Sequence, residues 1–293
     1  MKKFQGTGVA LVTPFSKSGK VDFKGLANVI ELNITNGTEY LVTQGTTGET
    51  AVLSKEEKKE VIKFTVEQTA GRVPVVAGFG GNNTLAIAHD LETFDFTGID
   101  AVLSVSPYYN KPTQKGIIEH YKVLAAASSK PIILYNVPGR TSSNIEAETT
   151  LKIANEIPNI IGIKEASGNF AQAMHLAKYR PENFLLISGD DNITLGLLAY
   201  GFDGVISVVG QAFPKIFSEM VRCGLRGDFA QARELHYKLN DITDMLFAEG
   251  NPGGVKYALE ILGVCESNLR LPLVSIGEEL KLKMRTAIKQ LEK

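Results

Sequence analysis

The sequence contains no tryptophan and only two cysteines, Cys223 and Cys265, among its 293 residues. Two thiols cannot form the disulfide framework of a secreted protein, so we expect a reducing compartment. No stretch approaches the roughly 20 consecutive apolar residues that cross a bilayer. The apolar run that follows Lys2 and Lys3 is too short for a signal peptide and is broken by Pro14. We therefore expect a cytoplasmic protein without a membrane partner.

The sequence also lacks an excess of positive or negative charge. The 31 basic and 32 acidic residues give a net charge of −1, so the chain has no electrostatic footprint for nucleic acid and we expect no nucleic-acid partner. Neither of the glycine-rich phosphate-binding motifs, GxGxxG or GxxxxGK[ST], is present, which argues against a nucleotide cofactor. The four histidines are scattered over predicted helices without the spacing of metal ligands, and we expect them on exposed helix faces; they are His89, His120, His175 and His236.

Short apolar runs recur along the chain, and each ends in glycine, proline or a polar residue. They are too short for helices and show no polar alternation. Continuous apolar character means that both faces are buried, which is typical of parallel strands. The eight runs are residues 8–14, 39–45, 73–79, 100–107, 131–138, 160–166, 184–190 and 203–209.

Helical patterns fill the intervals between these runs. An apolar stripe from Phe23 to Ile34 stops before Gly37, residues 54–57 form a capping box, and Pro214 suits a first helical turn. The runs start about 28 residues apart, which leaves room for one helix after each strand. This regular repeat predicts an α/β fold, a (β/α)₈ TIM barrel. An open doubly wound sheet is the alternative, but it rarely has eight strands so evenly spaced.

The barrel is expected to be complete near residue 225. Apolar stripes within 232–246 and 280–291 predict further helices, and no low-complexity linker precedes them. We therefore divide the chain into a barrel, residues 1–225, and a C-terminal helical extension, residues 226–293, that packs on the barrel.

Lys164 is the most informative polar residue, because it follows four apolar or glycine residues at the end of the sixth predicted strand. The carboxyl ends of barrel strands converge on one mouth. Burial there disfavours the ammonium form of a lysine, and a neutral amine can form a Schiff base with a carbonyl compound. The alternative is a structural ion pair between Lys164 and Glu165 or Glu49.

Hydroxyl groups follow the neighbouring predicted strands. Tyr135 ends the fifth strand, Thr46 and Thr47 follow the second, and Tyr108 and Tyr109 follow the fourth. Imine and enamine steps need proton donors and acceptors, and such hydroxyls supply them. The alternatives are that the tyrosine hydroxyls only satisfy backbone groups and that Gly45–Gly48 is an ordinary turn.

Charged side chains stand at two further strand ends. Arg140 follows the fifth strand and is placed to hold a substrate carboxylate in bidentate fashion, or else to form a surface ion pair. For Asp190 and Asp191 we favour a structural role, capping the helix after the seventh strand.

Five motifs, GTTGE, SPYYNKP, YNVPGRT, GIKEASGN and GVISV, follow one another between residues 45 and 208, within a match that covers essentially the whole chain. In this order and spacing they resemble the dihydrodipicolinate synthase family, also called 4-hydroxy-tetrahydrodipicolinate synthase, within the N-acetylneuraminate lyase superfamily. The resemblance implies a lyase of the class I aldolase type that condenses pyruvate with L-aspartate 4-semialdehyde, in diaminopimelate and lysine biosynthesis. It implies no cofactor beyond a covalent imine on the enzyme.

The resemblance also implies a role for each site residue. Lys164 forms the imine, Tyr135 donates and accepts protons, Thr46 and Tyr109 complete the proton relay, Thr47 and Ile206 contact pyruvate, and Arg140 binds the semialdehyde carboxylate. Family members are typically homotetramers built from tight dimers. The relay tyrosine that matches Tyr109 then comes from the neighbouring subunit.

One departure concerns regulation. Lysine-inhibited members carry two histidines and a glutamate where this chain has Lys55, Lys58 and Ala86. Two added cations and a missing carboxylate should repel the ammonium group of lysine, so we expect weak or absent feedback inhibition. Two alternative functions stay open from sequence alone: a related aldolase that cleaves a 2-keto acid, and an inactive paralogue that only binds.

Overall fold

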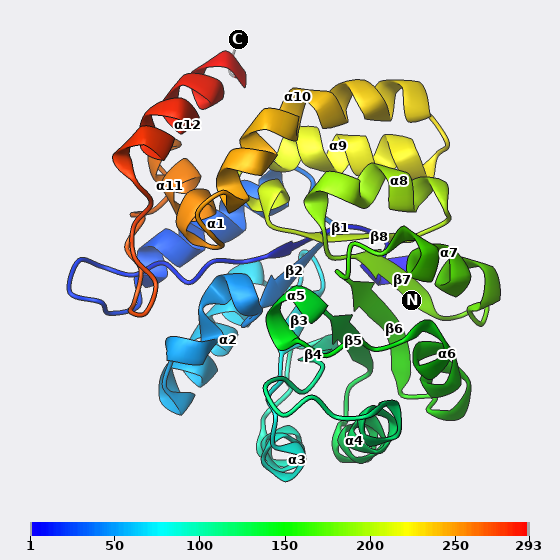
Figure 1. Cartoon of the computed structure of the whole chain (residues 1–293). Helices are drawn as coiled ribbons and strands as arrows, with labels where there is room; N and C mark the ends of the chain where they lie inside the picture. The colour runs from blue at the N-terminus through cyan, green and yellow to red at the C-terminus, as the bar shows by residue number, and fades with distance from the viewer. Residues whose placement is uncertain (1, 292–293) are drawn as a thin grey trace.

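A computed structural model describes residues 2–291 of the chain. Eight parallel strands pair in chain order, and β1 pairs with β8 to close the barrel (Figure 1). This confirms the predicted TIM barrel with a C-terminal helical extension. The strands are β1 (Gly6–Ala10), β2 (Tyr40–Thr43), β3 (Val75–Gly78), β4 (Ala101–Val105), β5 (Ile132–Asn136), β6 (Ile160–Glu165), β7 (Leu185–Ser188) and β8 (Gly204–Ser207).

The predicted runs coincide with the strands, except that β1 begins and ends earlier than residues 8–14. The Leu11 N–H still donates to the Val42 carbonyl of β2 at 2.9 Å, but the next N–H, that of Val12, donates to the side chain of Gln211 at 2.9 Å. Pro14 has no N–H to give to a neighbouring strand. The segment after Ala10 therefore belongs to the mouth of the barrel.

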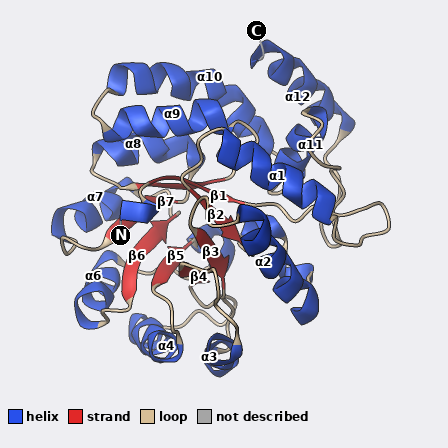
Figure 2. Cartoon of the chain, turned by 180° about the vertical axis from the view of Figure 1, so that it is seen from behind, coloured by secondary structure: helices blue, strands red, loops and turns tan. Residues whose placement is uncertain are grey.

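Helices surround the strands on the outside, as Figure 2 shows from behind. The capping box predicted at residues 54–57 is present, with Ser54 and Glu57 each accepting from the backbone of the other, and Pro214 opens its helix as expected. The helices of the barrel are α1 (Phe23–Thr35), α2 (Lys55–Thr69), α3 (Thr84–Thr93), α4 (Gln114–Ala127), the short α5 (Pro138–Thr141), α6 (Ala147–Glu156), α7 (Phe170–Tyr179), α8 (Thr194–Ala199) and α9 (Pro214–Leu225).

Three helices follow α9: α10 (Phe229–Phe247), α11 (Gly253–Ile261) and α12 (Glu278–Leu291). In both views α10 lies along α9, and α11 lies beside α12 (Figures 1 and 2). The sequence pattern predicted α10 and α12 but not α11. Within residues 2–291 we find no helix that is both long enough and apolar enough to cross a membrane.

Apolar side chains from all around the sheet fill the barrel interior. The interior cluster includes Val42, Tyr135 and Ile206. At the amino ends of the strands, Phe4 from the first turn of the chain packs edge-on against Tyr40, with 5.7 Å between ring centroids. The interior is therefore a packed core closed at this end, and the opposite end is where polar groups collect.

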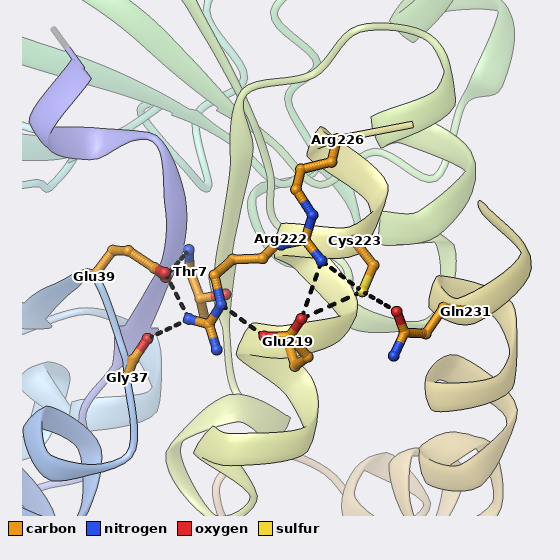
Figure 3. Close-up of polar contacts among 8 residues, drawn as sticks. All are labelled: Thr7, Gly37, Glu39, Glu219, Arg222, Cys223, Arg226 and Gln231. Carbon is orange, nitrogen blue, oxygen red and sulfur yellow. Dashed lines mark hydrogen bonds and ion pairs between the residues drawn. The ribbon is translucent and has the colours of Figure 1, made fainter. Parts of the chain in front are cut away.

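An ion-pair network ties the amino end of the barrel together (Figure 3). The Glu39 carboxylate accepts from the Thr7 N–H at 2.7 Å and from Arg222 of α9 at 2.9 Å. Arg222 also donates to Glu219 at 3.0 Å, and Glu219 accepts from Arg226 at 3.2 Å. The network joins β1, the start of β2 and α9 at the face away from the mouth.

Candidate active site

Lys164 lies on β6 at the mouth end of the barrel, directly beside Tyr135 of β5 in the strand register. Its side chain is buried, with 5% of the residue exposed. The Nζ atom lies 4.3 Å from the centroid of the Tyr135 ring. A buried amine next to a phenol is the arrangement that imine chemistry requires.

The alternative role for Lys164, an ion pair with a neighbouring carboxylate, is wrong. The Glu165 carboxylate accepts instead from the Ser167 N–H at 2.7 Å and from Gln172 Nε2 at 2.9 Å. The Glu49 carboxylate pairs with Lys256 at 2.5 Å. Within residues 2–291 no carboxylate oxygen lies within 4.0 Å of Lys164 Nζ. The amine is therefore not held as a paired ammonium ion.

A cavity of about 630 Å³ opens at the mouth. Thr46, Tyr135 and Arg140 line it, together with Tyr108. Lys164, Thr47 and Ile206 are not among its lining residues; they lie buried in the adjoining wall, with 5%, 2% and 1% of each residue exposed. The structure thus brings six of the seven predicted site residues to this end of the barrel, on or behind the cavity wall.

The turn after β2 is fixed from two sides. Residues Thr46–Gly48 form one 3₁₀ turn, and the Gly48 carbonyl accepts from the Thr13 hydroxyl at 2.7 Å. From the C-terminal extension, Asn251 Nδ2 donates to Thr47 Oγ1 at 2.9 Å. Asn251 also lines the cavity. The sequence analysis missed this residue, because nothing local in the Gly250–Gly254 segment indicates a contact with the mouth.

Arg140 and Tyr109 are both exposed, but only Arg140 lines the cavity. Arg140 lines the cavity from α5, and within the described chain it forms no ion pair, so the surface-pair alternative is wrong. Tyr109 is 88% exposed, has a left-handed backbone with φ 74°, and is not among the cavity-lining residues. Its own chain therefore does not enclose its side chain.

The two aspartates after β7 have separate structural roles. Asp190 caps a 3₁₀ turn (Asp191–Ile193) by accepting from the Asn192 N–H at 3.3 Å, as predicted. Asp191 instead accepts from the Val208 and Val209 N–H groups at 3.0 and 3.2 Å. Burial raises the pKa of both carboxyls. Asp191 therefore fixes the segment that follows Ile206.

Of the four histidines expected on exposed helix faces, only His89 is exposed, and His120 departs furthest from the expectation. His89 is exposed, and His175 and His236 are half-buried, but His120 is buried with 4% of the residue exposed. His120 Nδ1 lies 2.8 Å from the Thr84 hydroxyl, and burial lowers its pKa from 6.5 to about 4. This ring joins α4 to α3 away from the predicted site residues. No group of three potential metal ligands occurs in residues 2–291.

Comparison with known proteins decides the family. The model of the dihydrodipicolinate synthetase family matches residues 3–291. The chain belongs to this family. It is 53% identical to a 4-hydroxy-tetrahydrodipicolinate synthase of Flavobacterium psychrophilum, over the whole of both chains. It is 50% identical to the synthase of Parabacteroides distasonis, over 98% of this chain and 97% of that one.

Solved structures of the dihydrodipicolinate synthetase family share the fold. The dihydrodipicolinate synthase of Aquifex aeolicus superposes with a TM-score of 0.95 at 44% identity, covering 99% of this chain and 98% of that one. The family, the lyase class and the synthase function predicted from the motifs are thereby confirmed. The roles of the individual site residues stay predictions.

Proposed function

We propose that this chain condenses pyruvate with L-aspartate 4-semialdehyde, the reaction of a 4-hydroxy-tetrahydrodipicolinate synthase in diaminopimelate and lysine biosynthesis, and that Lys164 forms the imine. The observation that carries this proposal is the state of Lys164: a buried amine without a carboxylate partner, 4.3 Å from the Tyr135 ring. No cofactor is needed, because the protonated imine itself withdraws electrons from the neighbouring carbon.

The reaction proceeds in four steps. The Lys164 amine adds to the keto carbon of pyruvate, and water leaves as the imine forms. Tyr135 removes a methyl proton to give the enamine, whose carbon then attacks the aldehyde. Tyr135 returns a proton to the alkoxide that forms. Attack of the substrate's own amine on the imine carbon closes the ring and releases Lys164.

The remaining site residues hold substrates and move protons. Arg140, unpaired at the cavity wall, binds the semialdehyde carboxylate through its planar fork of donors. Thr47 and the Ile206 backbone hold pyruvate. Thr46 passes protons between Tyr135 and Tyr109 of the neighbouring subunit. The high exposure of Tyr109 supports this last assignment.

A homotetramer built from tight dimers, working in the cytoplasm, is part of the proposal. The site needs a tyrosine that its own chain leaves exposed, so assembly and activity are linked. The predicted absence of strong lysine inhibition belongs here too, because Lys55 and Lys58 both line the cavity. An initial-rate assay should show little inhibition by submillimolar lysine; strong inhibition contradicts this part.

The test is reductive trapping. Borohydride added with pyruvate should reduce the imine and leave a stable adduct on Lys164, which mass spectrometry of the peptide identifies. The variant Lys164→Arg, whose side chain is similar in length but cannot form the imine, is the control. An unlabelled wild-type chain would identify a binding protein. Coupling the product to the following reductase separates a synthase from a 2-keto-acid aldolase, which would give no reducible product.

A further inference from the structure

The C-terminal extension reaches into the mouth of the barrel at two neighbouring points. Asn251, just before α11, donates to Thr47 Oγ1 at 2.9 Å. Lys256 of α11 pairs with Glu49 at 2.5 Å, and both of these side chains are fully buried. Both contacts fall on the single turn that carries the threonine hydroxyls.

The Lys256–Glu49 pair anchors the extension to this turn. Glu49 has a left-handed backbone, φ 53° and ψ 33°, which a non-glycine residue adopts only when its surroundings impose it. Its carboxylate also accepts from the Arg270 N–H at 3.2 Å. Lys256 in turn donates to the Asn268 carbonyl at 2.8 Å. A buried charge held by several partners has little freedom to move, so Asn251 stands at a fixed position against Thr47.

The direction of the Asn251 hydrogen bond matters for the chemistry. A threonine hydroxyl has one proton to donate and lone pairs to accept. Because Oγ1 already accepts from Asn251, the Thr47 proton is available for a different acceptor. Thr47 follows the cavity-lining Thr46. An anionic acceptor that the proposed reaction supplies is the carboxylate of the keto acid.

We propose that Asn251 is a positioning residue for the reaction: it donates to Thr47 Oγ1 and thereby commits the Thr47 hydroxyl to donate to the pyruvate carboxylate. Asn251 acts through Thr47 and not on the reacting atoms. This inference rests on the proposed function. It makes the C-terminal extension part of the pyruvate site and not only a cover for the barrel.

The experiment is a double-mutant cycle on the full-length enzyme. Asn251→Ala should raise KM for pyruvate about tenfold, the effect of one lost oriented hydrogen bond, with a much smaller change in kcat. Asn251→Asp, which keeps an acceptor but removes the donor, should behave like the alanine variant. In the Thr47→Val background, Asn251→Ala should raise KM no further, because its target is gone.

The matched control is Asn28→Ala. Asn28 of α1 likewise donates from its amide across the boundary to the extension, to the Val264 carbonyl at 3.0 Å. That variant should keep the wild-type KM. Independent, multiplicative effects of Asn251→Ala and Thr47→Val would overturn the inference, and so would a wild-type KM in Asn251→Asp. Borohydride trapping on the wild-type enzyme separates the two failures. If only the inference about Asn251 fails, Lys164 is still labelled; if the proposed function fails, Lys164 stays unlabelled.

Discussion

Gly189, directly after β7, shows how closely single residues shape the surroundings of Lys164. A Cβ atom at Gly189 would lie 2.9 Å from Lys164 Cε and 2.7 Å from Ala166 Cβ. Both distances are shorter than any normal carbon contact, so a larger residue forces the lysine side chain to move. The Lys164 amine can therefore occupy its position only because residue 189 is a glycine.

We predict that Gly189→Ala lowers kcat at least tenfold while the protein stays folded. The flexible lysine side chain can shift to relieve its own contact, and a small backbone shift must relieve the contact with Ala166. Imine formation depends strongly on where the lysine amine points. The measurement is the rate of borohydride-trapped adduct formation beside a thermal unfolding curve. Gly116→Ala in α4, where the nearest atom lies 3.3 Å from the added carbon, is the control. Equal trapping rates for both variants would show that Gly189 has no part in placing Lys164.

His120 makes a prediction about pH at the contact between α3 and α4. Its pKa is lowered by burial to about 4, against 6.5 for an ordinary histidine. Between these two pH values His120 binds a proton in the unfolded chain but not in the folded chain. Stability should therefore be lost as pH falls from about 6.5 to about 4, by about 3 kcal/mol. Urea unfolding at pH 7 and pH 4.5 measures the loss, and His120→Gln should make it smaller; His236, whose pKa burial also lowers, contributes in the same direction and stays. An unchanged pH dependence in that variant would assign the loss to other groups.

Between elements, the Glu39 network makes a prediction about stability. Burial raises the pKa of Glu39, and Arg222 supplies its one ion pair in residues 2–291. Removing one partner of a largely buried pair leaves an uncompensated charge. Arg222→Ala should therefore cost about 1–3 kcal/mol of unfolding free energy. KM and kcat should not change, because this end of a barrel serves stability.

Arg226→Ala is the matched control in the same network. Arg226 also pairs with Glu219, but its side chain is 56% exposed, and exposed pairs contribute little. Denaturant unfolding should give the Arg222→Ala variant a clearly lower unfolding free energy than the Arg226→Ala variant. If the two variants lose equal stability, the half-buried Glu39 carboxylate does not depend on Arg222.

The features that the sequence predicts correctly are those that leave a pattern in neighbouring residues. The eight strands were predictable because each is buried on both faces and so reads as one apolar run. Lys164 and Tyr135 were predictable because strand ends in a barrel meet at one mouth. Helix α11 was not, because Pro252 caps it and Gly253 and Gly254 begin it, and proline and glycine have low helix propensity. Gly254 is needed there: a Cβ atom would lie 2.3 Å from the Leu246 carbonyl oxygen.

Contacts across long sequence separations were out of reach for the same reason. Asn251 and Thr47 are 204 residues apart, and no pattern in either segment indicates that the two side chains are in contact. The burial of His120 was also missed, since a polar residue on a helix reads as exposed unless its neighbours are known. Tertiary packing decides such cases, and local propensity does not.

At the scale of the whole molecule, the proposed relay role of Tyr109 requires a second chain, because its own chain leaves the side chain exposed. With 88% of the residue exposed and a left-handed backbone, Tyr109 projects away from its own fold. In a two-fold dimer each subunit would give its Tyr109 to the site of the other. Tyr109→Phe should then lower turnover sharply with little change in assembly, because only one hydroxyl is lost.

Mixing two inactive variants tests the exchange directly. A Lys164→Ala subunit lacks the amine but offers an intact Tyr109, and a Tyr109→Phe subunit retains the amine. After unfolding and refolding together in equal amounts, half of the dimers are hybrids, and each hybrid contains one complete site of two. Activity should therefore recover to about one quarter of the wild-type value if the tyrosine acts across the two-fold interface. If the tyrosine serves its own chain, no hybrid contains a complete site, and the mixture stays at the average of the two variants.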